Sequence, residues 1–388
     1  MSNKPKLAII VNSFYSFGGG ERWAIELSKK IKDDFGVTLI HQVMEGEVDS
    51  LERIEFDKSE DTSIKLVKIT CYGKQSNQFG YNYIFRIPTF AGFYRLAKTI
   101  KNSDVIYQVS FNPLIFSFSV FVAKIFGKRL IIGIHNPTFP NLFKKDNTAL
   151  ESLEKLYFKF ILRFADAFHV LNRRDMLLVK HNLKKKVYLI PNPLFEKVSP
   201  KILSTQSKKF VVLFVGRLAV RDKGVDMLKQ IIEKTVQIDK KIEFRIIGLG
   251  EGGDLVNDLV HRYPNNVKQL GFISYNKVKV NYMNSNLLIM PSRIEAFPFV
   301  VLEAQSFGLP VVAFNIPGPK DIISPRKTGE LVSPFNVGKF VDKIISYDNL
   351  WRNDPKKYYI IKQNVFDITN KKYDSNKIIS ELKKLIAG

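Results

Sequence analysis

The stretch from Asn286 to Val312 constrains the fold more than any other part of the chain. It opens with a short apolar run, NLLIM, which has the length and composition of a buried strand, and Pro291 ends that run. Pro298 suits the first turn of a helix, where its missing N–H costs nothing. Gly308 and Pro310 end this helix, and a second apolar run begins there. The stretch therefore predicts a strand, a loop, a helix and a further strand.

Two glutamates in this stretch predict a binding site. Glu303 falls inside the predicted helix among apolar residues, and a buried carboxylate needs a partner because burying a lone charge is costly. A sugar diol is one such partner, since a carboxylate can accept two hydrogen bonds. Glu295 lies in the loop before the helix, whose N-terminus favours anions. Alternatively, Glu303 reaches out to solvent or pairs with a nearby Lys or Arg, and Glu295 is an ordinary surface loop residue. The occurrence of both across one strand–loop–helix junction favours the site.

The same residues resemble the glutamate-pair motif of the retaining glycosyltransferases with the GT-B fold, glycosyltransferase family 4. That motif reads roughly Glu-Gly-Phe-(Gly/Pro), then Glu-Ala, then Gly-x-Pro-Val-Val. The chain departs from it at Ala296, where the family usually has Gly, and Ala tolerates fewer backbone conformations. The matching residues are Glu295-Ala296-Phe297-Pro298, Glu303-Ala304 and Gly308-Leu309-Pro310-Val311-Val312.

Length and composition predict a globular protein of two domains, with three left open. The chain has 388 residues, of which 45% are hydrophobic and 25% are charged. Its single cysteine, Cys71, excludes a disulfide framework and a cysteine metal site, and it fits a reducing cytosol. The N-terminus shows no signal-peptide pattern. The apolar region 111–126 is short for a membrane span, so we expect a buried helix there.

The net charge of +23 bears on what the protein binds rather than on how it folds. Residues 1–100 carry 14 Lys and Arg against 12 Asp and Glu, whereas residues 101–200 carry 16 against 7. The basic excess therefore begins after the first hundred residues. Nucleic acid, anionic lipid and an acidic polymer are candidate partners, and a basic surface without a specific partner is the alternative.

The first half of the chain holds two candidate site segments, each after a predicted strand. A strand at 6–12 leads to Gly19 and Gly20, and glycines before a helix let backbone N–H groups approach an anion. In the family, a Gly-Gly pair at this place faces the donor phosphates and the acceptor. His135 follows a strand at 129–134, at the end of the strand where parallel sheets bind ligands. From position alone, a turn histidine bonded to backbone is equally consistent. The family resemblance, in which a His here contacts the transferred sugar, favours the site.

The second half begins with a strand at 210–215 and a loop that carries two cations, Arg217 and Lys223. Both suit a diphosphate, Arg by its planar fork and Lys as a point charge. An ion pair with Asp222 is the alternative for either one. The match to the family's Gly-Arg-Leu and Lys-Gly favours phosphate binding. The resemblance adds donor-binding positions at Gly216, at Gly248 in a Gly-x-Gly, and at the backbone of Phe272 and Ile273, which would hold the base.

Both halves share this strand–loop–helix organisation, which predicts an α/β protein with two doubly wound sheets. A polar stretch with a proline, residues 199–209, marks the domain boundary. The resemblance implies the GT-B fold, with two Rossmann-like domains facing across a cleft. The acceptor domain would span residues 1–198 and the donor domain residues 199–373. The last helix, about 374–388, would pack back on the acceptor domain.

The resemblance also implies the reaction. A sugar would pass from a nucleotide-diphosphate sugar, by analogy a UDP-sugar, to a glycan, lipid-linked or cell-wall polymer acceptor with retention of configuration. Glu303 would hold the ribose, Glu295 the sugar, and Arg217 with Lys223 the diphosphate. Backbone N–H groups near Phe297 and Phe299 would help to bind the phosphate. We expect no cofactor and no metal, because no Asp-x-Asp triplet occurs.

We expect the protein in the cytoplasm or at the inner face of the membrane, where the basic residues of 101–200 suit a lipid-phosphate carrier. Two other classes stay open. One is a sugar-nucleotide-binding subunit without turnover. The other is a basic nucleic-acid-binding protein, although no nucleic-acid-binding module is recognisable.

Overall fold

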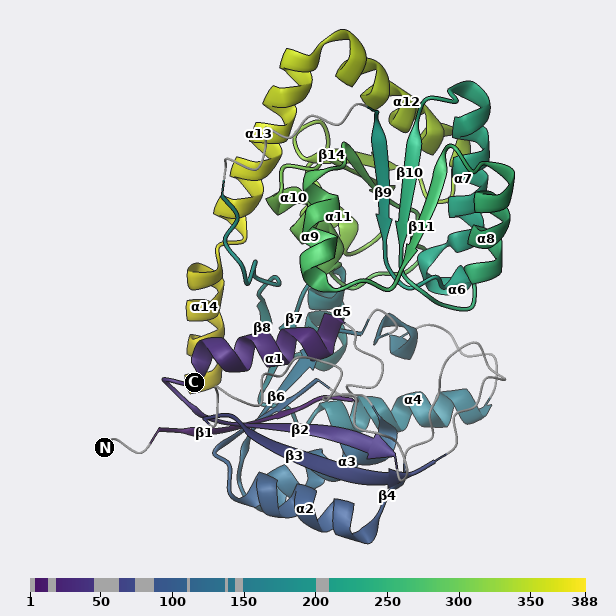
Figure 1. The fold of residues 1–388 in the computed structure, drawn as a ribbon. Coiled ribbons are helices and arrows are strands. Elements are labelled where there is room, and N and C mark those ends of the chain that lie inside the picture. Colours follow the sequence, from purple (N-terminus) through teal and green to yellow (C-terminus); the bar gives the residue numbers. More distant parts are fainter. Residues whose placement is uncertain are drawn as a thin grey trace. The chain divides into compact units, whose positions relative to one another are not determined.

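The computed structural model describes residues 4–12, 19–44, 63–73, 87–109, 112–136, 139–143, 149–199 and 209–388. The chain divides into two compact units, shown in Figure 1. Unit 1 consists of Met1–Pro191 together with Asn376–Gly388, and unit 2 of Asn192–Ser375. Each unit is a largely parallel sheet covered by helices, so the predicted α/β class with two doubly wound sheets is confirmed. Most of the polar stretch 199–209 lies outside the described residues.

In the described part of unit 1 the sheet has the order β4-β3-β2-β1-β5-β6-β7-β8. Neighbouring strands are parallel except β3 and β4, and the order reverses at β1. Ligands bind outside such a reversal in open α/β sheets. The strands are β1 (Lys6–Ile10), β2 (Gly36–Met44), β3 (Lys65–Tyr72), β4 (Ile87–Pro88), β5 (Val105–Gln108), β6 (Arg129–Ile134), β7 (Ala167–Val170) and β8 (Val187–Leu189).

The helices of unit 1 begin where the sequence offers capping side chains. Thr89 Oγ1 accepts a hydrogen bond from Gly92 N (3.0 Å), and Asn112 Oδ1 accepts one from Ile115 N (3.3 Å). The last helix, α14, is tied to this unit because Arg129 Nη1 donates to Ile386 O at 2.8 Å. The helices are α1 (Gly19–Ile31), α2 (Phe90–Lys101), α3 (Pro113–Ile125), the 3-10 turn η3 (Phe139–Phe143), α4 (Ala149–Leu162), α5 (Arg173–Leu183) and α14 (Ser375–Ala387).

The helix expected to be buried at 111–126 is α3, and the expectation of full burial was wrong. Ile115, Phe116 and Val120 are buried, whereas Phe121 and Ile125 are 65% and 60% exposed. The outward face of α3 is as apolar as the inward face. The sequence pattern therefore could not distinguish a helix buried all round from one with an exposed apolar side.

In unit 2 the described sheet has the order β11-β10-β9-β12-β13-β14, and all neighbours are parallel. Its strands are β9 (Val211–Val215), β10 (Glu243–Ile247), β11 (Val267–Gly271), β12 (Leu287–Met290), β13 (Val311–Phe314) and β14 (Gly329–Val332). Its helices are α6 (Val220–Lys223), α7 (Val225–Ile238), α8 (Gly253–Arg262), α9 (Tyr275–Met283), α10 (Phe299–Ser306), α11 (Pro319–Ile322), α12 (Val337–Asn353) and α13 (Pro355–Lys372).

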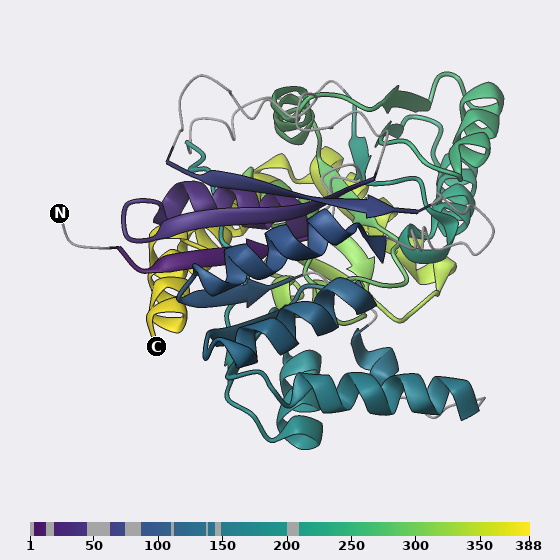
Figure 2. The same cartoon turned by 90° about the horizontal axis from the view of Figure 1, so that it is seen from below.

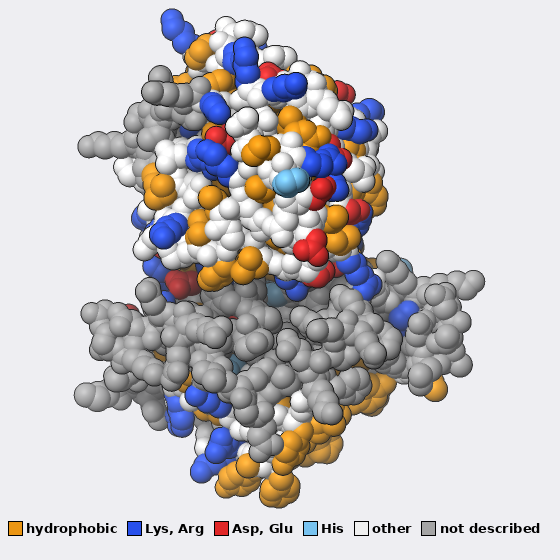
Figure 3. Space-filling model, turned by 45° about the vertical axis from the view of Figure 1, so that its right-hand side comes forward, with side chains coloured by type: hydrophobic (Ala, Val, Ile, Leu, Met, Phe, Trp, Pro, Cys, Tyr) orange, Lys and Arg blue, Asp and Glu red, His pale blue; other side chains and the backbone are white. Residues whose placement is uncertain are grey.

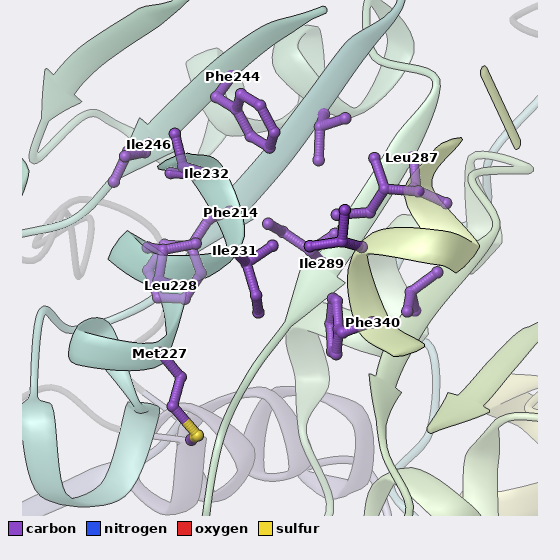
Figure 4. Packing of buried hydrophobic residues seen from close by; sticks show 14 of the residues in the cluster. Phe214, Met227, Leu228, Ile231, Ile232, Phe244, Ile246, Leu287, Ile289 and Phe340 are labelled. Carbon is purple, nitrogen blue, oxygen red and sulfur yellow. The ribbon is translucent and has the colours of Figure 1, made fainter. Parts of the chain in front are cut away.

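The core of unit 2 explains why its strands are continuous apolar runs. Helices cover both faces of the sheet, so side chains that alternate along a strand are all buried. Figure 4 shows side chains of the strands, such as Phe214 and Ile289, packed against Leu228 and Ile231 of α7 and Phe340 of α12. All five are no more than 2% exposed. This packing fixes the carboxyl ends of β9 and β12, from which the candidate site is built.

Candidate functional site

The reversal of strand order in unit 2 brings together loops that are distant in the sequence. β12 lies directly beside β9, although β10 and β11 come between them in the chain. The loops that follow β9 and β12 therefore leave the same edge of the sheet side by side. The first loop carries Gly216 and Arg217 and leads to Lys223 at the end of α6, and the second carries Glu295. Ligands bind at such a place in open α/β sheets.

Lys223 and Glu295 form an ion pair across this edge. Lys223 Nζ lies 2.6 Å from Glu295 Oε1, and the two side chains are 27% and 9% exposed. Asp222, the alternative partner considered for both cations, pairs with Arg217 instead. The distance from Arg217 Nη2 to Asp222 Oδ2 is 3.3 Å, and Arg217 is 55% exposed. An exposed pair of this kind contributes little energy, so Arg217 can change partners at low cost when an anion binds.

Arg293 holds the Glu295 loop in place, and sequence reasoning did not find it. Its guanidinium donates to Asp226 Oδ1 at 2.7 Å, to Asp226 Oδ2 at 2.6 Å and to Val220 O at 2.6 Å. The Arg293 backbone N–H donates to Asp222 O at 2.8 Å. The side-chain hydrogen bond from Arg293 lowers the pKa of Asp226, and the same bond raises the pKa of Arg293. The loop after β12 is thus clamped to α6 and α7, which places Glu295 beside Lys223.

Glycine is required at two positions in these loops. Gly224 has φ +66°, and a Cβ there would lie 2.2 Å from the carbonyl oxygen of Pro291. Gly248 has φ +140°, and a Cβ there would lie 1.8 Å from the carbonyl oxygen of Gly216. Neither φ suits an L side chain, and neither contact leaves room for one. Gly248 is therefore required for the close packing of the loops after β9 and β10, independently of its predicted role in donor binding.

Glu303 lies in α10 and is 7% exposed. The hydroxyl of Tyr282, from α9, donates to Glu303 Oε2 at 3.1 Å. Tyr282 is fully buried and stacks on Phe307, with 5.6 Å between ring centroids. The structure thus orients the Glu303 carboxylate with a hydrogen bond from a tyrosine, a partner that the sequence did not indicate.

The remaining predicted positions of unit 2 lie in three different environments. Phe272 and Ile273 follow β11, and the Phe272 side chain is 83% exposed. Phe297 is buried, and its carbonyl oxygen accepts a hydrogen bond from Asn192 Nδ2 at 3.2 Å. Phe299 begins α10 and stacks on Phe195, with 6.0 Å between ring centroids. Phe297 and Phe299 are therefore anchored by packing, whereas Phe272 presents an open aromatic face.

In unit 1, the predicted residues Gly19 and Gly20 form the start of α1. His135 follows β6 directly, and its ring packs edge-on against Trp23 of α1, with 4.4 Å between ring centroids. The two glycines, expected to precede a helix, are thus part of it, and the start of α1 and His135 belong to one neighbourhood joined by a buried tryptophan. His135 belongs to unit 1 and the Lys223–Glu295 pair to unit 2.

His135 ends a chain of hydrogen bonds through His169 of β7. His169 Nε2 donates to Ile190 O at 2.7 Å, because a carbonyl can only accept. Nδ1 of His169 is therefore an acceptor, and it faces both the Tyr107 hydroxyl and His135 Nε2, the latter at 3.3 Å. Burial lowers the pKa of His169 to about 4. Burial, and then the neighbouring His169, hold the pKa of His135 well below 6.5. His135 is thus neutral at pH 7 and acts as a hydrogen-bonding group, not as a cation.

Sequence reasoning missed four residues that shape these two neighbourhoods. Their signals were present but weak. His169 is a polar residue inside the apolar strand AFHV, and Arg293 lies two positions before Glu295. Trp23 directly follows the Gly-Gly-Glu-Arg segment, and Tyr107 lies in the strand VIYQ. Among the described residues, no group of three or more His, Cys, Asp or Glu side chains could hold a metal ion.

Comparison with protein families gives a match in the second unit. Residues 196–364 match the model of the family described as "Glycosyl transferases group 1". The matched segment contains every predicted site residue of unit 2, from Gly216 to Glu303. It therefore supports a group 1 glycosyltransferase.

Curated relatives match over part of their length. The "Uncharacterized 41.2 kDa protein in cps region" of Klebsiella pneumoniae is 34% identical over 152 residues, which is 39% of this chain and 40% of that protein. The UDP-Gal:alpha-D-GlcNAc-diphosphoundecaprenol alpha-1,3-galactosyltransferase of Escherichia coli is 27% identical over 226 residues, 51% of this chain and 57% of that enzyme. The chain spans about half the length of the curated relatives that it matches.

Solved structures match over nearly the whole chain. Anabaena HepE in complex with UDP and glucose has a TM-score of 0.74 and 19% identity, covering 99% of this chain and 100% of its own. TarM of S. aureus, in complex with fondaparinux, alpha-GlcNAc-glycerol and UDP, has a TM-score of 0.74 and 15% identity, with coverage of 99% and 100%. At these identities the likeness shows the fold, and the predicted GT-B fold is confirmed.

Proposed function

We propose that the chain is a glycosyltransferase that moves a sugar from a UDP-sugar to a glycan, lipid-linked or cell-wall polymer acceptor. The observation that carries this proposal is the Lys223–Glu295 ion pair at the strand-order reversal of unit 2. The pair puts a cation suited to phosphate and a carboxylate suited to hydroxyls at one point. It also lies inside the segment that matches the group 1 model.

The donor would be bound by residues of unit 2. Arg217 and Lys223 would hold the diphosphate, Glu303 the ribose diol, and Glu295 the sugar. The loop of Phe272 and Ile273 would hold the base. In the reaction, a bond forms between the acceptor oxygen and C1 of the sugar while the bond from C1 to the phosphate oxygen breaks. The electron pair leaves with UDP, whose growing negative charge the two cations stabilise, and the leaving diphosphate takes up the proton that the acceptor hydroxyl loses.

The proposal also covers the nucleotide, the acceptor, the stereochemistry and the absence of a metal. The choice of UDP is supported by two structural neighbours that hold UDP and by the relative named for UDP-Gal. That relative's acceptor is a sugar on diphosphoundecaprenol, which supports a lipid-linked acceptor at the cytoplasmic face of the membrane. Membership of family 4 and retention of configuration rest on the glutamate-pair motif. We further propose that no metal takes part, because two cationic side chains already serve the leaving diphosphate.

The test is donor binding and hydrolysis by the full chain with a panel of UDP-, GDP- and ADP-sugars. We expect binding of the UDP-sugar by calorimetry, and slow release of UDP that EDTA leaves unchanged. Lys223→Ala should lower UDP release by about a hundredfold or more, as when a preorganised charge at a leaving group is removed.

Lys229→Ala is the matched control. Lys229 Nζ lies 2.6 Å from Asp258 Oδ2, and its side chain is 26% exposed, close to the value for Lys223. This variant also loses an ion pair in unit 2, but away from the site, so UDP release should stay within about twofold of the wild type. Equal losses in both variants would refute the assigned role of Lys223. UDP binding without any release or transfer would instead indicate a sugar-nucleotide-binding subunit.

A further inference from the structure

Three helices of unit 1 lie side by side on one face of its sheet, as Figure 2 shows. α2 and α3 meet through Phe93 and Phe118, whose ring centroids are 4.7 Å apart. α3 and α4 meet through Phe116 and Phe158, at 6.2 Å. The three helices are therefore neighbours, and we call their outward sides together the α2–α4 face.

The α2–α4 face is apolar where a surface helix is normally polar. In each helix the exposed apolar residues recur at helical spacing, so they form a stripe on the outward side. Phe90 is 91% exposed, and Phe121 and Leu156 are each 65% exposed. Figure 3 shows hydrophobic side chains gathered along the lower edge of the molecule, where α2 and α3 lie in Figure 1. The stripe comprises Phe90 and Tyr94 of α2, Leu114, Phe121 and Ile125 of α3, and Leu153, Leu156, Tyr157 and Phe160 of α4.

Single exposed apolar residues are ordinary, but a contiguous patch over three helices marks an interaction surface. Among the described residues, no helix is long and apolar enough to cross a bilayer. An exposed apolar stripe of this kind is suited to lying on a membrane or a partner. Exposed aromatic residues beside lysines are typical of segments that insert shallowly into the interface of a bilayer.

The charges around the stripe select the partner. Residues 90–128 contain five Lys and Arg and a single acid, Asp104. The carboxylate of Asp104 accepts a hydrogen bond from the backbone N–H of Lys6 at 2.8 Å, so it is engaged with β1. α4 and the segment that follows it add Lys155, Lys159 and Arg163 against Glu151, Glu154 and Asp166. Lys124 of α3 pairs with Asp166 at 2.8 Å, so the cations of residues 90–128 not held by that pair are Arg95, Lys98, Lys101 and Lys128.

A basic rim around an apolar stripe matches a bilayer with anionic headgroups, because lysine stems lie along apolar surface while their ammonium groups reach phosphates. A second copy of the chain fits less well, since a two-fold contact would set the same cationic rim against itself. We infer that the α2–α4 face binds the surface of an anionic phospholipid bilayer. The inference deepens the proposed function, on which it rests for the lipid-linked nature of the acceptor. It names the surface that brings the enzyme to that acceptor.

The test is cosedimentation of the full chain with vesicles of phosphatidylcholine alone or mixed with phosphatidylglycerol, at low and high salt. We expect binding to the mixed vesicles that weakens as salt rises, and little binding to phosphatidylcholine alone. The double variant Phe121→Ser, Leu156→Ser should bind mixed vesicles at least about tenfold more weakly. Lys98→Gln, Lys128→Gln should bind about twenty-five-fold more weakly, taking roughly a fivefold contribution from each lysine near the surface.

The matched control is Ile238→Ser, Ile360→Ser, which removes two apolar residues of unit 2 that are 62% and 56% exposed. It should bind vesicles as the wild type does. An equal loss in this control, or equal binding to both kinds of vesicle, would overturn the inference. The inference would also be overturned if light scattering showed dimers of the wild type that only the Phe121, Leu156 variant abolishes. The α2–α4 face would then bind a second copy of the chain. UDP binding is measured in parallel. If neither the wild type nor any variant binds UDP, but vesicle binding changes among the variants as expected, the proposed function fails and the inference about the membrane surface stands.

Discussion

The clamp formed by Arg293 gives the sharpest prediction about how the site is built. In Arg293→Gln the guanidinium is lost, and with it the hydrogen bonds to both oxygens of Asp226 and to Val220 O. Each bond involves a charged group and is worth about 1.5–3 kcal/mol when buried. The two side chains are 30% and 34% exposed, so solvent screening reduces each contribution to about 1 kcal/mol. We therefore expect unit 2 to lose about 3 kcal/mol of unfolding free energy.

The loss should depend on pH in a defined direction. The hydrogen bond from Arg293 lowers the pKa of Asp226 below its ordinary value of 3.8. A depressed carboxyl pKa stabilises the folded state above the unfolded-state pKa, and this contribution is lost as the pH falls through the folded-state pKa. The difference between wild type and Arg293→Gln should thus be full at pH 7 and should shrink below about pH 4.

Tryptophan fluorescence can isolate unit 2 in the full chain. The chain has two tryptophans, Trp23 in α1 of unit 1 and Trp351 in α12 of unit 2. In a Trp23→Phe background, urea unfolding followed at Trp351 reports on unit 2 alone, because Trp351 packs on Phe210 with ring centroids 5.8 Å apart.

The control for the clamp is Arg262→Gln. Arg262 is 42% exposed and pairs with Glu233 and Asp258 on the surface, so its loss should cost less than about 1 kcal/mol. If Arg293→Gln unfolds within about 0.5 kcal/mol of the wild type, the clamp does not hold the loop and the reasoning is wrong.

Two further predictions use the same Trp351 assay. Lys362 of α13 is 5% exposed, and burial lowers its pKa from 10.5 to about 8. The protonated, charged form of Lys362 is disfavoured in the folded state, so the unfolding free energy of the wild type should rise between pH 8 and 10.5. Lys362→Met should stabilise the protein at pH 7 by up to about 3 kcal/mol, and this gain should fade by pH 10.5. A gain that does not vary with pH would contradict this. Gly248→Ala should cost about 3 kcal/mol or more because its Cβ would overlap a backbone oxygen at φ +140°, whereas Gly253→Ala, with nothing within 4 Å, should change stability by less than about 1 kcal/mol. Similar losses in both glycine variants would show that the close approach at Gly248 does not matter.

Much of the fold could be predicted from local patterns. The strand at 129–134 occurs with the predicted bounds, the apolar run 286–290 forms β12 (Leu287–Met290), and the helix predicted between Pro298 and Gly308 is α10 (Phe299–Ser306). These segments were predictable because a buried parallel strand is apolar throughout and because proline and glycine mark the ends of a helix. The last helix, expected at about 374–388, is α14 (Ser375–Ala387), and the helical chain breaks at Tyr373 between it and α13. The split follows from membership in two different units, which no local pattern encodes.

The candidate site, too, could be predicted only in part. Local motifs were enough to single out Arg217, Lys223, Glu295 and Glu303. They could not say which charges meet. Asp222 lies next to Lys223 in sequence, yet Lys223 pairs with Glu295, whose position in the chain is 72 residues away. The sheet decided this pairing, because it sets β12 directly beside β9.

Sequence alone determined the element types, the two-sheet organisation and the kinds of side chain available for binding, since each depends on residues close together in the chain. Only the tertiary structure decided the partners: the Arg293 clamp, the tyrosine that orients Glu303, and the histidine pair in unit 1. It also decided which side of α3 faces outward. Such contacts join segments brought together by strand order and helix packing, and their energies depend on distance and burial rather than on separation along the chain.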